Sequence, residues 1–214
     1  MLGKVIAIAV TAGLAVGPAL AGASQSPPPL VRVAASSATQ PVAKTQGSVF
    51  LLRGLLNVFS LGMDKLARKL RAKGMPVRVT NFTNWRGFAT ELVSRYRTDK
   101  SLAPVVIIGH SLGADAAVDM ANYLVENGVP VRLVVAFDGV HDGHKVSSGV
   151  QEVINYYQAD GWGKFVEAGA GFNGKLTNID LSGREGIDHL NIEKSDALHA
   201  EVITRLDAIF NRPR

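Results

Sequence analysis

The sequence of 214 residues contains no cysteine. This absence excludes disulfide bonds, thiolate catalysis and cysteine-based metal sites, and it also excludes a lipid anchor on an N-terminal cysteine. It does not exclude an oxidising compartment, because disulfides are optional in exported proteins. Charged residues are also few, at 19% of the chain against 47% hydrophobic residues, which is typical of a soluble globular protein with a substantial core.

The formal net charge is +5, and the basic residues are scattered along the chain. The densest basic cluster falls on one expected helix and consists of Lys65, Arg68, Lys69, Arg71 and Lys73. We interpret it as a solvated helix face. Basic and aromatic residues do not alternate in the way that a nucleic-acid stacking surface requires, so we expect no nucleic-acid partner.

The first 23 residues have the three parts of a secretory signal peptide. Met1–Lys4 is a short positive start, Val5–Ala21 is uncharged and mostly apolar, and Ala21-Gly22-Ala23 is a small-residue cleavage site. The alternative is a retained membrane anchor, for which the glycines, the proline and the many alanines of this segment are unfavourable. We therefore expect cleavage after Ala23, export to the periplasm or the medium, and no stable membrane span afterwards.

Residues 24–46 are rich in Ser, Pro, Ala and Thr and include Pro27-Pro28-Pro29. Such a composition predicts an extended linker without a core of its own. The folded domain is therefore expected to span residues 47–214, with no internal repeat and no second domain.

Within that domain, short apolar runs alternate with segments of helical periodicity. Strands are expected at residues 48–52, 77–79, 104–108, 131–137, 152–157 and 176–181, and helices at 60–73, 85–96, 114–127 and 195–210. Ser60 is a plausible N-cap of the first helix. The alternation predicts an α/β fold, with a mostly parallel sheet of about six strands and helices on both faces.

The motif that carries chemistry is Gly109-His110-Ser111-Leu112-Gly113. It directly follows an apolar strand and directly opens an amphipathic helix, which is the context that a nucleophile elbow requires. The two glycines leave room for the neighbouring strand and helix, and the turn projects the hydroxyl of Ser111 above the sheet. The helix N-terminus behind Ser111 favours developing negative charge. Ser111 is therefore the predicted nucleophile.

The stretch Val106–Ala114 resembles the elbow of α/β-hydrolase lipases and thioesterases, in which Gly-His-Ser-Leu-Gly is frequent. The rest of residues 47–214 matches the family in the order and pattern of its elements, as a minimal single-domain form that lacks the family's first strands and any large cap. The resemblance implies a serine hydrolase that cleaves acyl esters through a Ser-His-Asp triad and an acyl-enzyme, without a cofactor or metal.

In this family the catalytic histidine follows the acid in the chain. His189 lies in the loop between the last strand and the last helix, where the family places that histidine, and we assign it as the general base. His110 precedes the nucleophile directly and cannot easily reach back to it. His141 and His144 precede the last two strands and lack a third ligand for a metal, and His199 lies inside the C-terminal helix.

Two aspartates compete as the acid that orients His189. Asp138 directly follows the apolar strand 131–137, so its position is well fixed, and it is the preferred candidate. Asp160 follows the next strand, at the commoner family position, but it lies in a glycine-rich stretch, and it stays open as the alternative acid. Asp188 is adjacent to His189 and is expected to point away from it.

The oxyanion hole is expected to consist of backbone N–H groups. One is that of Leu112, the residue after the nucleophile, and the other is that of Leu55, in the loop after the first strand. Arg53 stands where relatives carry a histidine. Since the backbone supplies the hydrogen bonds, this departure need not abolish function.

Export favours an ester over cytoplasmic thioesters, so the predicted partner is a small-molecule or lipid acyl ester. The loop 161–174, with Trp162, Phe165, Val166 and Phe172, is either a short lid over an apolar acyl site or an ordinary surface loop. A thioesterase or acyltransferase with the same triad is the first alternative. The second is a binding protein on a hydrolase fold whose triad has decayed, because a fold does not fix a function.

Overall fold

The computed structural model describes residues 46–55 and 61–211. The predicted signal peptide, nearly all of the linker and the proposed cap Ser60 lie outside these residues. The strands of the main sheet are β1 (Ser48–Arg53), β2 (Val77–Asn81), β3 (Val105–His110), β4 (Val131–Phe137), β6 (Glu152–Tyr157) and β8 (Lys175–Asp180). The α-helices are α1 (Leu61–Ala72), α2 (Trp85–Tyr96), α3 (Leu112–Glu126) and α4 (Asp196–Phe210).

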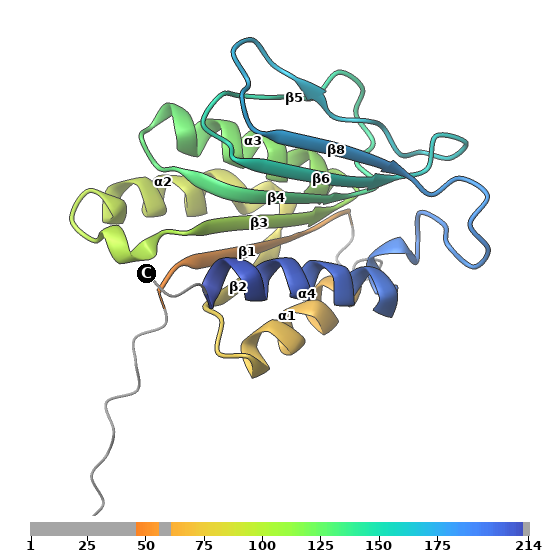
Figure 1. Ribbon diagram of the computed structural model, residues 1–214, viewed down its shortest axis with the longest axis horizontal. Helices are drawn as coiled ribbons and strands as arrows, with labels where there is room; N and C mark the ends of the chain where they lie inside the picture. Colours follow the sequence, from red (N-terminus) through yellow and green to blue (C-terminus); the bar gives the residue numbers. More distant parts are fainter. Residues whose placement is uncertain (1–45, 56–60, 212–214) are drawn as a thin grey trace, which may run out of the picture. The chain divides into compact units, whose positions relative to one another are not determined.

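The six strands pair in the order β2-β1-β3-β4-β6-β8, and every pair is parallel. The strands therefore end at a common edge, which is the end marked by the arrowheads in Figure 1. The loops that follow β1, β3, β4, β6 and β8 all leave the sheet at this edge, and it is there that open parallel sheets bind their ligands.

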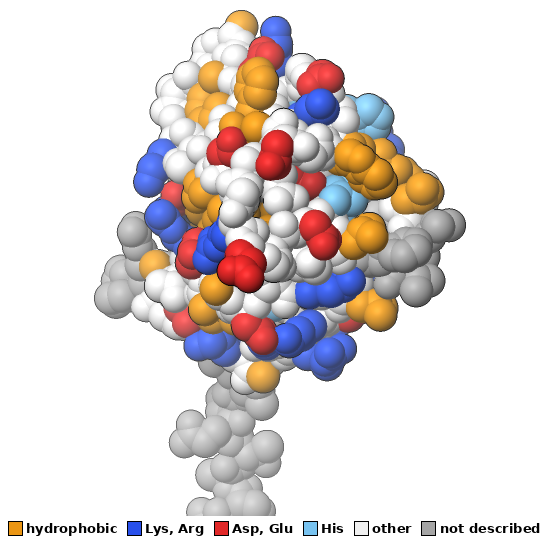
Figure 2. Space-filling model, turned by 90° about the vertical axis from the view of Figure 1, so that its right-hand side faces the viewer, with side chains coloured by type: hydrophobic (Ala, Val, Ile, Leu, Met, Phe, Trp, Pro, Cys, Tyr) orange, Lys and Arg blue, Asp and Glu red, His pale blue; other side chains and the backbone are white. Residues whose placement is uncertain are grey.

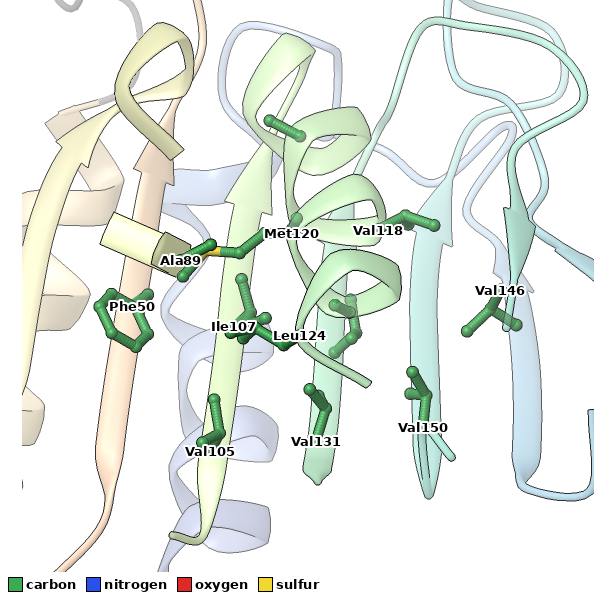
Figure 3. Close-up of a cluster of buried hydrophobic side chains, with 14 of the residues drawn as sticks. Phe50, Ala89, Val105, Ile107, Val118, Met120, Leu124, Val131, Val146 and Val150 are labelled. Carbon is green, nitrogen blue, oxygen red and sulfur yellow. The ribbon is translucent and has the colours of Figure 1, made fainter. Parts of the chain in front are cut away.

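Helices cover both faces of the sheet (Figure 1), so the strands are apolar on both sides. On one face α2 and α3 pack against side chains such as Phe50 and Ile107, and Figure 3 shows Met120 and Leu124 of α3 lying over Ile107. On the other face α1 and α4 pack against the alternate strand residues, which include Val106 and Ile108.

The structure confirms the predicted fold class and all ten expected helices and strands, with ends that differ by no more than a few residues. It adds a small two-stranded parallel sheet, β5 (Lys145–Val146) with β7 (Glu167–Ala168). Short 3-10 turns, η2 (Phe82–Asn84), η3 (Lys100–Leu102) and η4 (Ile192–Lys194), also escaped the sequence analysis, because elements this short carry no periodicity. None of the helices in the described segments is long and apolar enough to cross a membrane.

Candidate active site

Ser111 occupies the one-residue turn between β3 and α3. Its backbone has φ +56° and ψ −129°, a region that side chains rarely adopt. The amide of Ser111 still donates to the carbonyl of Phe137 on β4, at 2.9 Å, so the strained residue is held by the sheet. Strain of this kind persists only where the surrounding structure enforces it, and it gathers at functional sites.

The two glycines of the motif are sterically required. A Cβ on Gly109 would overlap the carbonyl oxygen of Gly113, and a Cβ on Gly113 would overlap the carbonyl oxygen of Leu52 on β1. The strand, the turn and the helix are thus packed backbone against backbone. The close backbone contacts that the two glycines of the motif predicted are therefore present in the fold.

Ser111, His189 and Asp138 come together at the carboxyl edge of the sheet. Nε2 of His189 lies 3.1 Å from Oγ of Ser111, and Nδ1 of His189 lies 2.6 Å from Oδ2 of Asp138. A carboxylate only accepts, so the Nδ1–H of His189 donates to Asp138. The lone pair of Nε2 is then directed at the serine hydroxyl, as a general base requires.

Asp138 is fully buried, with no exposed side-chain surface. A buried carboxylate must be hydrogen-bonded to be tolerated. Oδ1 of Asp138 accepts from the backbone N–H of Gln158 at 2.9 Å, and Oδ2 accepts from His189. The backbone of Asp138 has φ +52°, a conformation that aspartate tolerates better than most residues, and its N–H donates to Tyr156 on β6.

The structure does not bring Asp160 to the histidine. Asp160 is exposed, and its backbone N–H donates to Oγ of Ser182 at 3.2 Å. Asp188 accepts from Leu190 and Asn191 within its own loop and so points away from the ring of its neighbour His189. Among the aspartates weighed from the sequence, Asp138 is the one whose carboxylate contacts His189.

Leu55 and Leu112, the two predicted oxyanion-hole residues, border the same cavity as Ser111. Leu112 is the first residue of α3, where backbone N–H groups have no partner within the helix. Arg53 makes a two-pronged ion pair with Asp64 of α1, with Nε 2.8 Å from Oδ2. Arg53 therefore ties the end of β1, just before Leu55, to the neighbouring helix.

A cavity of about 650 Å³ opens above the serine. Its lining is mostly apolar and consists of Leu55, His110, Ser111, Leu112, Val140, Gly161, Trp162, Lys164, His189 and Leu190. Leu55, Trp162 and Leu190 remain about half exposed or more, so the rim is apolar as well. Figure 2 shows histidine side chains beside a group of exposed hydrophobic side chains on this face.

The loop 161–174 borders the cavity, and whether it acts as a lid or is a surface loop stays a prediction. Its first residues line the cavity, and the Trp162 ring lies 4.8 Å from the His189 ring, centroid to centroid. Its later residues form β7 of the small sheet. The backbone of Gly163 packs against Asp138, because a Cβ at Gly163 would overlap Oδ1.

His141 and His144 contact one carboxylate beside the site. Nδ1 of His141 lies 2.7 Å and Nδ1 of His144 lies 3.2 Å from oxygens of Asp115, which is itself buried. The hydrogen bond to Asp115 raises the pKa of His144. Asp115 also accepts from the backbone N–H groups of Val140 and His141. This cluster anchors the loop that follows Asp138.

His110 has a place in the site that the sequence analysis missed. Its side chain is 1% exposed, and its Nε2 lies 2.8 Å from the backbone carbonyl of His189. The chain position of His110, directly before Ser111, argues against a role as the general base and says nothing of a role as a hydrogen-bond donor. Strand alternation carried the missing signal, because His110 shares the face of Val106 and Ile108, which α4 covers.

No protein-family model matches the sequence, and no curated protein matches it. Several solved structures are similar at low identity. The type II thioesterase BorB from the borrelidin biosynthetic cluster has a TM-score of 0.48 and 13% identity, covering 78% of this chain and 95% of its own. Human thioesterase 2 has a TM-score of 0.44 and 11% identity, covering 74% and 93%. An acetylxylan esterase has a TM-score of 0.44 and 11% identity, covering 78% and 99%.

Proposed function

We propose that the protein is a serine hydrolase that cleaves carboxylic esters with an apolar acyl group. The observation that carries the proposal is the hydrogen-bonded chain from Ser111 through His189 to Asp138, with distances of 3.1 and 2.6 Å. A serine, an imidazole and a buried carboxylate in this order form the arrangement that makes a serine hydroxyl nucleophilic at neutral pH.

In the proposed reaction, Nε2 of His189 takes the hydroxyl proton as Oγ of Ser111 attacks the acyl carbonyl carbon. The carbonyl oxygen becomes an oxyanion, which we expect the backbone N–H groups of Leu112 and Leu55 to stabilise. His189 then returns the proton to the departing alcohol oxygen, and an acyl-enzyme remains. A water molecule then attacks the acyl carbon while His189 takes a proton from it. His189 passes this proton to Oγ of Ser111, and the carboxylic acid product leaves.

The lining of the cavity supports the substrate class. Leu55, Leu112, Val140, Trp162 and Leu190 give an acyl chain apolar surface next to Ser111. Burial of such a chain contributes about 0.8 kcal/mol for each CH₂ group removed from water. We therefore expect catalytic efficiency to rise with acyl length until the cavity of about 650 Å³ is filled.

A thioesterase or an acyltransferase with the same triad is the second candidate. The same Ser111 acyl-enzyme would form from a thioester, or would pass its acyl group to an alcohol in place of water. The apolar rim of the cavity, with Trp162 and Leu190 exposed, would offer an acceptor alcohol apolar surface next to Ser111. Measuring alcohol transfer products beside free acid separates these activities.

The test is hydrolysis of p-nitrophenyl esters of graded chain length by the wild type, Ser111→Ala and Ser94→Ala. Ser94 is exposed on α2 and serves as the matched control. We expect the wild type and Ser94→Ala to turn over the esters, and Ser111→Ala to lose about 10³-fold or more in kcat. Full activity of Ser111→Ala would falsify the proposal. A wild type that binds esters without turnover, and whose Ser111 resists a fluorophosphonate, would instead support a binding protein.

We also propose that the protein is exported, on the basis of residues 1–23. Expression of the full chain in a bacterium, followed by N-terminal sequencing of the protein in the periplasm and medium, tests this. A mature protein that starts at Ser24 is the expected result. Retention of Met1 in a membrane fraction is the contrary one.

A further inference from the structure

The segment 189–193, which carries the proposed base, is held by two buried histidines. At its start, Nε2 of His110 lies 2.8 Å from the carbonyl oxygen of His189. At its end, Nε2 of His199 on α4 lies 2.7 Å from the carbonyl oxygen of Glu193. A carbonyl oxygen only accepts, so in both pairs the Nε2–H of the histidine is the donor.

Both histidines lie where a charged ring is unfavourable. His110 is 1% exposed and His199 is fully buried. Burial lowers the pKa of His110 to about 4 and also lowers the pKa of His199. Nδ1 of His199 accepts from Nζ of Lys69 at 3.3 Å, which agrees with a neutral ring that carries its proton on Nε2. At neutral pH each ring is thus a fixed, uncharged donor.

The segment has further attachments at its far end. The backbone N–H of Gly62, in the first turn of α1, donates to Oε1 of the buried Glu193 at 3.3 Å. A Cβ on Gly62 would overlap the Glu193 carbonyl, so the two backbones are in close contact. The end at Glu193 is thus attached to both α1 and α4. At the other end, hydrogen bonds from Leu190 and Asn191 to Asp188 hold the loop to itself, and the His110 ring attaches the carbonyl of His189 to the end of β3.

We propose that His110 is a positioning residue for the reaction, whose donor to the His189 carbonyl sets the distance between the His189 imidazole and Ser111, with His199 as secondary support. The inference rests on the proposed function. His110 suits this role because it is the last residue of β3 and directly precedes Ser111. The end of β3 therefore sets the positions of both Ser111 and His189. A misplacement of about 1 Å can cost about 10²-fold in rate.

The experiment compares His110→Phe with His110→Gln. Phenylalanine keeps the shape of the ring and removes the donor, and glutamine places an amide N–H close to where Nε2 lies. We expect His110→Phe to lower kcat on a short p-nitrophenyl ester by about 10- to 100-fold, with KM within about twofold of the wild type. The rate of fluorophosphonate labelling of Ser111 should fall in parallel, and His110→Gln should recover to within about threefold of the wild type.

Three results would overturn the proposal. The first is a folded His110→Phe protein with wild-type kcat and labelling rate. The second is a His110→Gln protein as slow as His110→Phe, because the donor would then be irrelevant. The third is a rise in KM without a fall in kcat, which would assign His110 to substrate binding. Failure of the wild type itself to label at Ser111 would remove the proposed function, and is thereby distinguished from failure of this inference alone.

If His110→Phe does not fold, variants of His199, the donor at the other end of the segment 189–193, test the proposal. His199 lies on α4 and contacts the Glu193 carbonyl, not the triad. His199→Phe is expected to lower kcat by about threefold or more at unchanged KM, and His199→Gln is expected to restore it. Wild-type kcat in a folded His199→Phe protein would contradict the idea that the segment 189–193 is held in place by these donors.

Discussion

Asp138 and Asp160 follow β4 and β6, two neighbouring strands that end at the same edge of the sheet. Asp138 comes one residue after its strand, is fully buried, and contacts His189 at 2.6 Å. Asp160 comes three residues after its strand, is exposed, and has its backbone bonded to Ser182. The same residue type at two similar places in the fold thus has two different environments.

The difference shows which contacts fix the carboxylate of Asp138 beside His189. The backbone of Asp138 is held by the sheet, because its N–H donates to the carbonyl of Tyr156 on β6. Its Oδ1 accepts from the N–H of Gln158, in the loop that leads to Asp160. The loop after β6 therefore helps to hold the carboxylate of Asp138, which follows β4. In this molecule the stretch after β6 supplies a donor and packing surface in place of a second acid.

The largest effect that would sharpen this comparison is expected from Asp138→Asn. An asparagine can offer its NH₂ to Nδ1 of His189, which moves the ring proton to Nε2 and removes the base from Ser111. We expect kcat to fall by about 10⁴-fold. The measurement is steady-state hydrolysis of a short p-nitrophenyl ester, with folding checked by circular dichroism.

Asp160→Asn is the matched control for that substitution. Asp160 is exposed and does not contact His189, so kcat should stay within about twofold of the wild type. If Asp160→Asn were the slower of the two proteins, the assignment of the acid would be reversed.

A smaller effect is expected from Gly163→Ala, which acts on Asp138 through packing. The added Cβ would overlap Oδ1 and displace the carboxylate from the His189 ring. We expect kcat to fall by about 10- to 100-fold. Gly87→Ala is the control, because Gly87 is exposed on α2 and a Cβ there would meet nothing within 4 Å. Equal rates in the two variants would mean that the carboxylate tolerates displacement.

The smallest expected effect is on the pH dependence of the free energy of unfolding, and it comes from the buried ring of His110. Burial lowers the pKa of His110 from 6.5 to about 4, and His189, Asp138 and Lys194 also act on it. Between these values the unfolded chain binds more protons, so the contribution of His110 is fully present above pH 6.5 and is lost as pH falls toward 4. Between pH 7 and 5.5 this loss amounts to about 1 kcal/mol.

Glu193 acts in the opposite direction, since burial raises its pKa to about 7, and its contribution is lost as pH rises from 4.5 toward 7. Urea denaturation of the wild type and His110→Gln at pH 7 and 5.5 isolates the histidine, because Glu193 is common to both proteins. The stability of the wild type should fall more than that of His110→Gln by about 1 kcal/mol. Equal changes in the two proteins would show that His110 is not desolvated.

Much of this architecture could be predicted from the sequence because the sheet is buried on both faces. Runs such as Val105–Ile108 and Val131–Phe137 are typical of strands covered on both faces, and the glycines around Ser111 indicate close backbone contact. The position of His189 between the last strand and the last helix followed from the chain order of the family that the elbow resembles. These features are local in sequence or fixed by order along the chain.

The choice between Asp138 and Asp160 could be weighed but not decided, because it depends on loop geometry at the edge of the sheet. Asp138 contacts Gln158 through a hydrogen bond and Gly163 through close packing, and these residues lie 20 and 25 positions away from it. No local sequence pattern predicts contacts over such a separation. The same holds for His110 and the carbonyl of His189, which are 79 positions apart.

The strand order also has a consequence for biosynthesis. Ser111 follows β3, while Asp138 and His189 follow β4 and β8 on one side of it, and Leu55 follows β1 on the other side. A ribosome therefore makes Leu55 first, then Ser111, then Asp138, and the proposed base His189 last of these four. Under the proposed mechanism, a nascent chain therefore has no general base to activate Ser111 until His189 has been added.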